Sequence, residues 1–225
     1  MIISTRKEFD NMKESKKRQV LIVSGPSGTG KSTIVHMMFE KDPDKYELVK
    51  SVTTRKSRDD SDYYTFVTQQ AFKNMLNEDA FLEANEYQGN GAMYGTPKKA
   101  VMEILEKGKI PILEIDVNGK MQVEKYAAKY GWDVVSIFVT ASPRVIYKRL
   151  LSRGESIQES IRRLRASSGE MAHITAYDLV VINENLNDTL KSIDLLLSGK
   201  TNTSPNFSDG EYDKLLQILL EEIDR

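Results

Sequence analysis

Residues 25–33, GPSGTGKST, fit the phosphate-binding pattern GxxxxGK[ST] and directly follow an apolar run at residues 20–23. Glycines at its turning points let the backbone aim several N–H groups at one phosphate. Lys31 would add a positive charge near the β and γ phosphates, and the Ser32 hydroxyl could ligate Mg²⁺. Residues 34–40 read as a helix whose positive dipole end would face the anion. The sequence therefore predicts a nucleotide-binding loop made of Gly25, Pro26, Ser27, Gly28, Thr29, Gly30, Lys31, Ser32 and Thr33.

Five short motifs rich in Arg, Tyr and acidic residues follow this loop. They are TTRKSR at 53–58, YTF at 64–66, FLE at 81–83, MYGT at 93–96 and LEID at 113–116. Arg55 and Arg58 could both bind one phosphate, because a guanidinium group presents paired donors. The two arginines therefore favour an anionic ligand.

The motifs, taken in this order, resemble those of the guanylate kinase family. The resemblance covers residues 18–198 and extends to the segments RLLSRG at 149–154 and RRL at 162–164. It implies ATP-dependent phosphorylation of GMP or dGMP to GDP, with ATP as phosphoryl donor and Mg²⁺ as the assisting metal.

The resemblance also implies which residues bind GMP. Arg55, Arg58 and the hydroxyls of Tyr64 and Tyr94 match residues that hold the monophosphate. Glu83 matches a carboxylate that accepts from guanine N1–H and the 2-amino group, two adjacent donors that adenine lacks. Polar pairing of this kind discriminates strongly between bases. The full set implied for GMP is Ser51, Arg55, Arg58, Tyr64, Glu83, Tyr94, Thr96 and Asp116.

On the ATP side, three downstream arginines match the lid and core arginines that close on the ATP phosphates in the family. They would stabilise charge on the γ-phosphoryl group as it moves. No general base is needed, because the acceptor phosphate is already anionic. Asn183, after the apolar run at 180–182, matches a contact to the adenine side of ATP. The catalytic set implied is Lys31, Arg55, Arg149, Arg153 and Arg163.

Three of these assignments leave alternatives open. Glu86 competes with Glu83 for the guanine base, and Arg162 competes with Arg163 for the phosphates. Asp116 could contact the base, the Mg²⁺ waters, or both, since an acidic residue that ends a central strand is also where a Walker-B carboxylate would sit.

Two segments depart from the family pattern. After Arg58 the run to Tyr64 is shorter than the family loop and lacks its Gly-Glu turn, so Asp59 or Asp60 must substitute for the acidic residue, or the acceptor site is looser. The segment at 87–93 is longer than usual. Both changes flank the acceptor pocket, so they bear on the identity of the acceptor more than on the use of ATP.

The elements that would position these residues alternate along the chain. Short apolar runs rich in β-branched residues, typical of buried parallel strands, lie at 20–24, 110–115, 134–140 and 179–182. Helical patterns lie at 97–107, 119–130, 143–153, 156–176 and 186–197. This alternation predicts an α/β fold with a doubly wound parallel sheet, and the resemblance places it in the P-loop nucleoside monophosphate kinase type. Ligands would sit at the carboxyl ends of the strands.

The polar stretch at 52–96 interrupts this alternation. It holds strand-like pieces at 51–54 and 63–67 and a helical piece at 70–77. We expect it to form an inserted GMP-binding lobe, with a lid at 149–165.

The two ends of the chain differ from the kinase-like domain at 18–198. Residues 1–17 are expected to be an N-terminal extension, and residues 199–225 a linker followed by an amphipathic helix. The helix could dock on the core or pair two subunits, because its apolar residues share one stripe: Tyr212, Leu215, Leu216, Leu219, Leu220 and Ile223.

Composition limits the other possibilities. The 32 basic and 33 acidic residues give a net charge of −1, so we expect no nucleic-acid partner and no membrane surface. The absence of Cys excludes disulfides, thiolate metal sites and a Cys nucleophile, and the two His residues leave little for a zinc site. With no long apolar stretch, the chain is expected to be cytoplasmic, acting on small molecules as a monomer or homodimer.

Two rival functions remain open on the sequence. One is a kinase of the same fold that acts on another phosphorylated acceptor, such as a ribose bisphosphate, but Glu83 and Thr96 would then lack a purpose. The other is a guanylate-kinase-like module that binds partners without catalysis. Lys31, Ser32 and the three matched arginines argue against it, since a scaffold has no use for neutralising a triphosphate.

Overall fold

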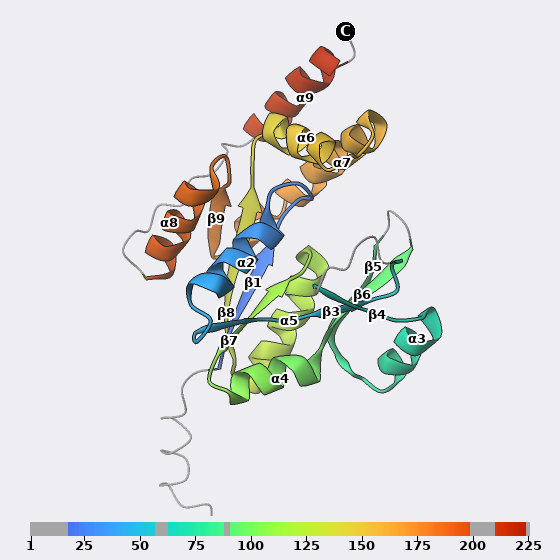
Figure 1. Cartoon of the computed structure of the whole chain (residues 1–225), viewed down its shortest axis with the longest axis vertical. Coiled ribbons are helices and arrows are strands. Elements are labelled where there is room, and N and C mark those ends of the chain that lie inside the picture. Colours follow the sequence, from blue (N-terminus) through green and yellow to red (C-terminus); the bar gives the residue numbers. More distant parts are fainter. Residues whose placement is uncertain (1–17, 57–62, 88–90, 199–209, 224–225) are drawn as a thin grey trace, which may run out of the picture.

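A computed structural model describes residues 18–56, 63–87, 91–198 and 210–223, and a five-stranded parallel sheet lies at its centre (Figure 1). The strand order is β2-β7-β1-β8-β9, and every neighbouring pair is parallel. This arrangement confirms the predicted α/β class and parallel sheet. The strands are β1 (Gln19–Ser24), β2 (Tyr46–Leu48), β7 (Ile110–Glu114), β8 (Asp133–Thr140) and β9 (Leu179–Ile182).

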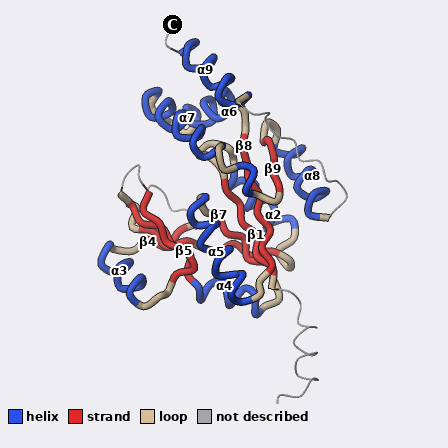
Figure 2. The backbone as a smooth tube through the Cα atoms, turned by 180° about the vertical axis from the view of Figure 1, so that it is seen from behind, coloured by secondary structure: helices blue, strands red, loops and turns tan. Residues whose placement is uncertain are grey.

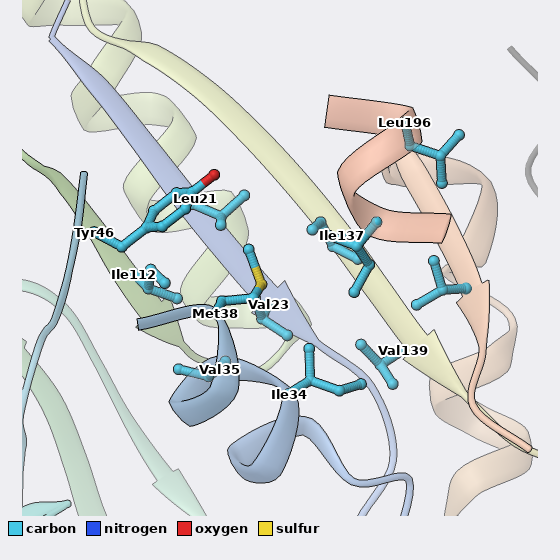
Figure 3. Close-up of a cluster of buried hydrophobic side chains, with 12 residues drawn as sticks. Leu21, Val23, Ile34, Val35, Met38, Tyr46, Ile112, Ile137, Val139 and Leu196 are labelled. Atoms are coloured by element: carbon cyan, nitrogen blue, oxygen red, sulfur yellow. The ribbon is translucent and has the colours of Figure 1, made fainter. Parts of the chain in front are cut away.

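Helices cover both faces of this sheet, which explains why its strands are mostly apolar. Leu21 and Val23 pack against α2 (Lys31–Lys41) and α8 (Leu186–Leu197) in the cluster drawn in Figure 3. Val20 and Ile22, which alternate with them along β1, pack against α4 (Lys98–Glu106) and α5 (Val117–Tyr130) on the opposite face. All four β1 side chains are at most 2% exposed.

A second, smaller sheet lies beside the first, in the order β4-β3-β6-β5. Its strands are β3 (Ser51–Thr53), β4 (Tyr64–Phe66), β5 (Phe81–Tyr87) and β6 (Ala92–Pro97), and α3 (Gln69–Asn77) packs on it. The rings of Phe72 on α3 and Phe81 on β5 stack with centroids 4.6 Å apart. The stretch at 52–96 thus has a small apolar core of its own.

Three helices form a separate layer beyond the carboxyl end of β8 (Figures 1 and 2). They are α6 (Pro143–Ser152), α7 (Ile157–Met171) and α9 (Glu211–Ile223). Tyr212 and Leu216 of α9 pack with Leu150 and Leu164 in one buried cluster, and the Tyr212 hydroxyl lies 2.6 Å from Ser167 Oγ. Most of the apolar stripe of the tail therefore packs on the core, one of the two alternatives left open on the sequence, whereas Leu215 of that stripe is 38% exposed.

Side-chain caps set where several helices begin. Asp116 Oδ1 accepts from Gly119 N at 2.7 Å and starts α5, and Ser156 Oγ accepts from Glu159 N at 3.2 Å and starts α7. Each cap pairs a backbone N–H that has no partner within the helix. Asn185 caps α8 in the same way.

The structure corrects several sequence predictions. The single helix expected at 156–176 is wrong: α7 ends at Met171, and a 3₁₀ turn at Ile174–Ala176 packs Ile174 against Phe138 and Tyr177 before β9 begins. Pro97 ends β6 and precedes α4 instead of opening that helix. Strands β2, β5 and β6 were not predicted.

Parts of the sequence predictions lie outside the described residues. These are the extension at 1–17, the shortened loop with Arg58, Asp59 and Asp60, part of the lengthened loop, and the linker at 199–209. None of the helices in the described part of the chain combines the length and hydropathy that a bilayer-spanning helix needs.

Candidate active site

The phosphate loop connects β1 to α2 and depends on glycine at its bends. Gly25 has φ +134°, and a Cβ there would lie 1.9 Å from the carbonyl oxygen of Val139. Gly30 has φ +92°, and a Cβ there would lie 2.5 Å from Nδ2 of Asn183. Any side chain at either position would both strain the backbone and collide with fixed neighbours.

Lys31 is the first residue of α2 and bends back over this loop. Its Nζ donates to the carbonyl oxygens of Gly25 at 2.6 Å and Pro26 at 2.9 Å. No side chain of the described residues caps the start of α2, so the backbone N–H groups and the lysine charge face the same space. Such an arrangement suits a polyphosphate.

Ser32 lies beside a carboxylate at the end of the neighbouring strand. Its Oγ donates to Glu114 Oε1 at 3.0 Å, and β7 ends at Glu114. Asp116, the residue considered for a Walker-B position, instead caps α5. The structure therefore places Glu114 where the sequence analysis considered Asp116.

The oxygen donors of Ser32 and Glu114 fit Mg²⁺ bound through a nucleotide. Mg²⁺ favours hydroxyl and carboxylate oxygens, keeps several of its waters and is usually held through only one or two protein groups together with phosphates. Within the described ranges, no cluster of three or more His, Cys, Asp or Glu side chains could hold a metal by itself.

Arginines from α6 and α7 reach the loop from the other side. Arg149 Nη1 donates to the carbonyl oxygen of Thr29 at 3.2 Å, and Arg163 Nη1 donates to Ser27 Oγ at 2.8 Å. Burial lowers the pKa of Arg149, Glu184 opposes this, and Arg153 adds to it. A guanidinium group stays charged despite such a shift. Arg153 follows the last residue of α6, and its side chain is exposed.

Two glutamates hold Arg163 in place. Its Nε lies 2.9 Å from Glu155 and 3.0 Å from Glu159, and its side chain is only 18% exposed. Arg162 is 48% exposed and pairs with Glu159 at 2.7 Å. Hydrogen bonds from Arg162 in the first place, and then from Arg163, lower the pKa of Glu159 to about 2. The geometry favours Arg163 for contact with the loop.

Asn183 contacts the same loop through a hydrogen bond to its backbone. It is 1% exposed, its Nδ2 donates to the Thr29 carbonyl at 2.8 Å, and its Oδ1 accepts from Thr189 at 3.1 Å. The side chain therefore supports the conformation of the loop, and the expected contact with adenine stays a prediction.

On the second sheet, the groups expected to hold the acceptor phosphate lie together. The Arg55 guanidinium lies 5.1 Å from the centre of the Tyr64 ring, which meets the Tyr94 ring edge-on at 6.0 Å. Burial, Glu114 and Tyr94 raise the pKa of Tyr64 to about 12, so its hydroxyl stays a donor at neutral pH. Arg55 Nε is buried without a hydrogen-bond partner among the described residues. A free, buried cationic donor of this kind suits an anion.

A cavity of about 530 Å³ lies along α2 and β2, and Tyr64 is the one member of this group that lines it. Ser51, Tyr64 and Glu114 contribute to its lining. The cavity thus joins a residue expected to contact GMP to the carboxylate beside Ser32.

Glu83 is a buried carboxylate on β5. It is 4% exposed, its Oε1 accepts from Thr96 Oγ1 at 2.7 Å, and its Oε2 accepts from Asn85 Nδ2 at 3.1 Å. Burial raises its pKa to about 7 and Asp116 adds to the rise, whereas hydrogen bonds from Thr96 and Asn85 oppose it. Glu86, the rival candidate, is exposed.

Comparison with known proteins identifies the family. A family model described as guanylate kinase matches residues 17–200. A guanylate kinase of Clostridium perfringens is 38% identical over 183 residues, covering 79% of this chain and 82% of the relative. One of Carboxydothermus hydrogenoformans is 35% identical over 188 residues, covering 82% and 89%. The chain belongs to the guanylate kinase family.

A solved structure agrees with this membership. The crystal structure of guanylate kinase from Anaplasma phagocytophilum is similar with a TM-score of 0.65 and 26% identity, covering 84% of this chain and 89% of that one. The recognition made from the sequence motifs is thereby confirmed, and the chain is an enzyme of this family.

Several residues of the candidate site were not predicted from the sequence. The sequence did contain an indication for Glu114, since this residue lies in the LEID motif at the end of a predicted strand. The sequence contained no indication for Asn85 or Gln122, because their contacts form only when α5 packs on β5. Glu170 on α7 also had none: burial raises its pKa, and Lys31 opposes the rise.

Proposed function

We propose that this chain binds ATP at the phosphate loop and GMP against the second sheet, with the residues described above in contact with the two substrates. The reaction is that of the family: the chain phosphorylates GMP to GDP with ATP as the donor. Membership supports this activity over the two rival functions considered from the sequence.

The observation that carries the choice of GMP is the buried Glu83 carboxylate. The partners given above for it, Thr96 and Asn85, are neutral donors, so the carboxylate keeps acceptor capacity for a ligand. Guanine presents N1–H and the 2-amino group side by side, whereas adenine presents an acceptor at N1. A purine that satisfied Glu83 with two donors would be selected over one that left it unpaired.

The phosphate of GMP would lie among Arg55, Tyr64 and Tyr94, with Arg58, which lies outside the described residues, as a further donor. Arg55 neutralises charge that would otherwise repel the ATP phosphates. The Tyr64 hydroxyl donates without competing as an anion, because its pKa is about 12. This grouping aligns the attacking oxygen with the phosphate loop.

The ATP phosphates would lie at the phosphate loop, close to the side chains of Lys31, Arg149 and Arg163. Lys31 now donates to two loop carbonyls and would turn toward the β and γ phosphates. When Mg²⁺ is bound, Ser32 and the nearby Glu114 carboxylate would help to hold it, and the ion would neutralise charge between these phosphates. Catalysis then consists of positioning and charge stabilisation.

Within this proposal, residues 149–165 of α6 and α7 act as a lid, and residues 52–96 form the acceptor lobe. The lid carries Arg149, Arg153 and Arg163, of which Arg149 and Arg153 repel each other. Two bound anionic nucleotides would supply the opposite charge and draw the lid and the acceptor lobe together.

A coupled assay of ADP release tests the proposal. The chain would be supplied with ATP, Mg²⁺ and one acceptor at a time: GMP, dGMP, AMP, CMP, UMP or a ribose bisphosphate. We expect turnover with GMP and dGMP far above the rate with the other acceptors. A chain that preferred a ribose bisphosphate, or released ADP with none of them, would contradict the proposal.

A further inference from the structure

Asn85 bridges Glu83 and Asp116, the two carboxylates expected to bind guanine. It lies two residues after Glu83 on β5, so both side chains point to the same face of the strand. Its Nδ2 donates to Glu83 Oε2 at 3.1 Å and to Asp116 Oδ1 at 3.2 Å. One amide group therefore ties a strand of the second sheet to the start of α5.

Gln122 fixes the orientation of that amide. Its Oε1 accepts from Ala84 N at 3.2 Å, so its Nε2 faces Asn85 and donates to Asn85 Oδ1 at 3.0 Å. Because the carbonyl oxygen of Asn85 is occupied by Gln122, its NH₂ group is directed at the carboxylates. The reverse orientation would place the amide oxygen of Asn85 against the two carboxylate oxygens and its nitrogen against the nitrogen of Gln122, and is excluded by repulsion.

We propose that Asn85, oriented by Gln122, is a positioning residue for guanine recognition, which holds Glu83 and Asp116 at the separation that the base donors require. The inference rests on the proposed GMP site and names a determinant of its specificity. Asn85 acts through the two carboxylates and is not itself placed in contact with the reacting phosphates.

Electrostatics gives this bridge a second consequence. Asp116 is the charged group that contributes to the raised pKa of Glu83, and the hydrogen bond from Asn85 opposes that rise. A Cβ at position 119 would lie 3.0 Å from Glu83 Oε2, so α5 packs directly against the carboxylate. Removing the Asn85 amide would leave two close carboxylates with one donor fewer, and Glu83 would hold its proton to a higher pH.

Steady-state kinetics on Asn85→Ala tests the inference, with GMP and inosine 5′-monophosphate, which lacks the 2-amino group, as acceptors. We expect the KM for GMP to rise about tenfold, while the KM for ATP and the kcat at saturating GMP stay within about threefold. The ratio of kcat/KM for GMP to that for inosine monophosphate should fall about tenfold. The pH below which the KM for GMP increases should move up by about one unit.

Companion variants separate the bridge from a general effect on the fold. Gln122→Glu keeps the acceptor for Ala84 N–H but loses the donor to Asn85, so it should reproduce the Asn85→Ala changes more weakly. Asn85→Asp, which places a third carboxylate beside the other two, should enlarge them. Glu86→Ala, at the next and exposed position of β5, should change none of these values.

Glu83→Gln distinguishes failure of the inference from failure of the proposed site. If Glu83→Gln raises the KM for GMP and Asn85→Ala leaves the KM, the acceptor ratio and the pH profile unchanged, the inference is overturned and the GMP site stands. If Glu83→Gln has no effect on GMP either, the site is misplaced and both proposals fall.

Discussion

The donor side and the acceptor side of the site are built in different ways. At the phosphate loop, Lys31 is held by the main-chain oxygens of Gly25 and Pro26 and Arg149 by that of Thr29, although Arg163 is held by side chains. At the acceptor side, Glu83 is held by other side chains, Thr96 and Asn85. A site held by backbone tolerates variation nearby, whereas a site held by side chains changes specificity with each of them.

The two sides also differ in how they respond to pH. Lysine and arginine side chains in general carry their charge throughout the neutral range. The carboxylate of Glu83, with its pKa raised by burial to about 7, changes charge within that range. We therefore expect the affinity for ATP to stay constant across the neutral pH range, while the affinity for GMP changes within it.

The largest effect is expected from Lys31→Ala. Removing the charge that would stabilise the transferred phosphoryl group should lower kcat at least about 100-fold. Circular dichroism should show an unchanged fold, since the side chain contacts only the loop. The matched control is Lys99→Ala, an 88% exposed lysine on α4. A folded Lys31→Ala protein with near-normal turnover would refute the phosphate-loop assignment.

Arg163→Ala should have the next largest effect. Loss of a charged donor at the loop should reduce kcat/KM for ATP by about 10- to 50-fold. Arg162→Ala, one residue away and exposed, is the control and should change it less than about threefold. If the two variants were ranked in the reverse order, the register chosen for this arginine would be one residue off.

Lowering the pH should weaken GMP binding selectively. The raised pKa means that Glu83 takes up a proton as pH falls through about 7, and a protonated carboxyl loses part of its capacity to accept the guanine donors. At pH 6 the KM for GMP should exceed that at pH 8 by about tenfold, because only about a tenth of the enzyme keeps Glu83 ionised. The KM for ATP serves as the internal control, and parallel changes in both would speak against Glu83.

The smallest expected effect is a decrease in the distance between the acceptor lobe and the lid when both nucleotides bind. Because the chain contains no Cys, Lys73→Cys on α3 and Gln158→Cys on α7 would provide unique sites for spin or fluorescent labels. With GMP and a non-hydrolysable ATP analogue bound together, the labels should approach by more than about 2 Å, and by less with either ligand alone. Arg153→Ala should reduce the approach. An unchanged distance with both ligands would rule out the lid.

Sequence alone predicted the donor side better than the acceptor side for a physical reason. The loop, Lys31 and Ser32 are contiguous in a short pattern whose spacing is fixed by its phosphate ligand. Strands β1, β7, β8 and β9 were predicted nearly to their ends, because buried parallel strands are apolar throughout. Motifs formed by residues close together in the sequence can therefore be recognised from the sequence alone.

The acceptor side depends on contacts between distant segments. Strand β5 was missed because Glu83 is buried where alternation requires an apolar residue, and the pairing with β6 shifts register between Phe81 and Glu83. The bridge from Asn85 to Asp116 spans 31 positions and exists only in the folded chain. Nothing in the spacing of these residues signals it.

The measurement that tests the central claim most directly is titration calorimetry of Glu83→Gln with GMP and with a non-hydrolysable ATP analogue. Replacing the charged acceptor should weaken GMP binding by about 1.5–3 kcal/mol, about 10- to 100-fold in Kd. The affinity for the ATP analogue should stay within about twofold, and Glu86→Gln on the same strand should bind both ligands like the parent chain. Equal losses for the two nucleotides, or a larger loss from Glu86→Gln, would contradict the assignment of guanine recognition to Glu83.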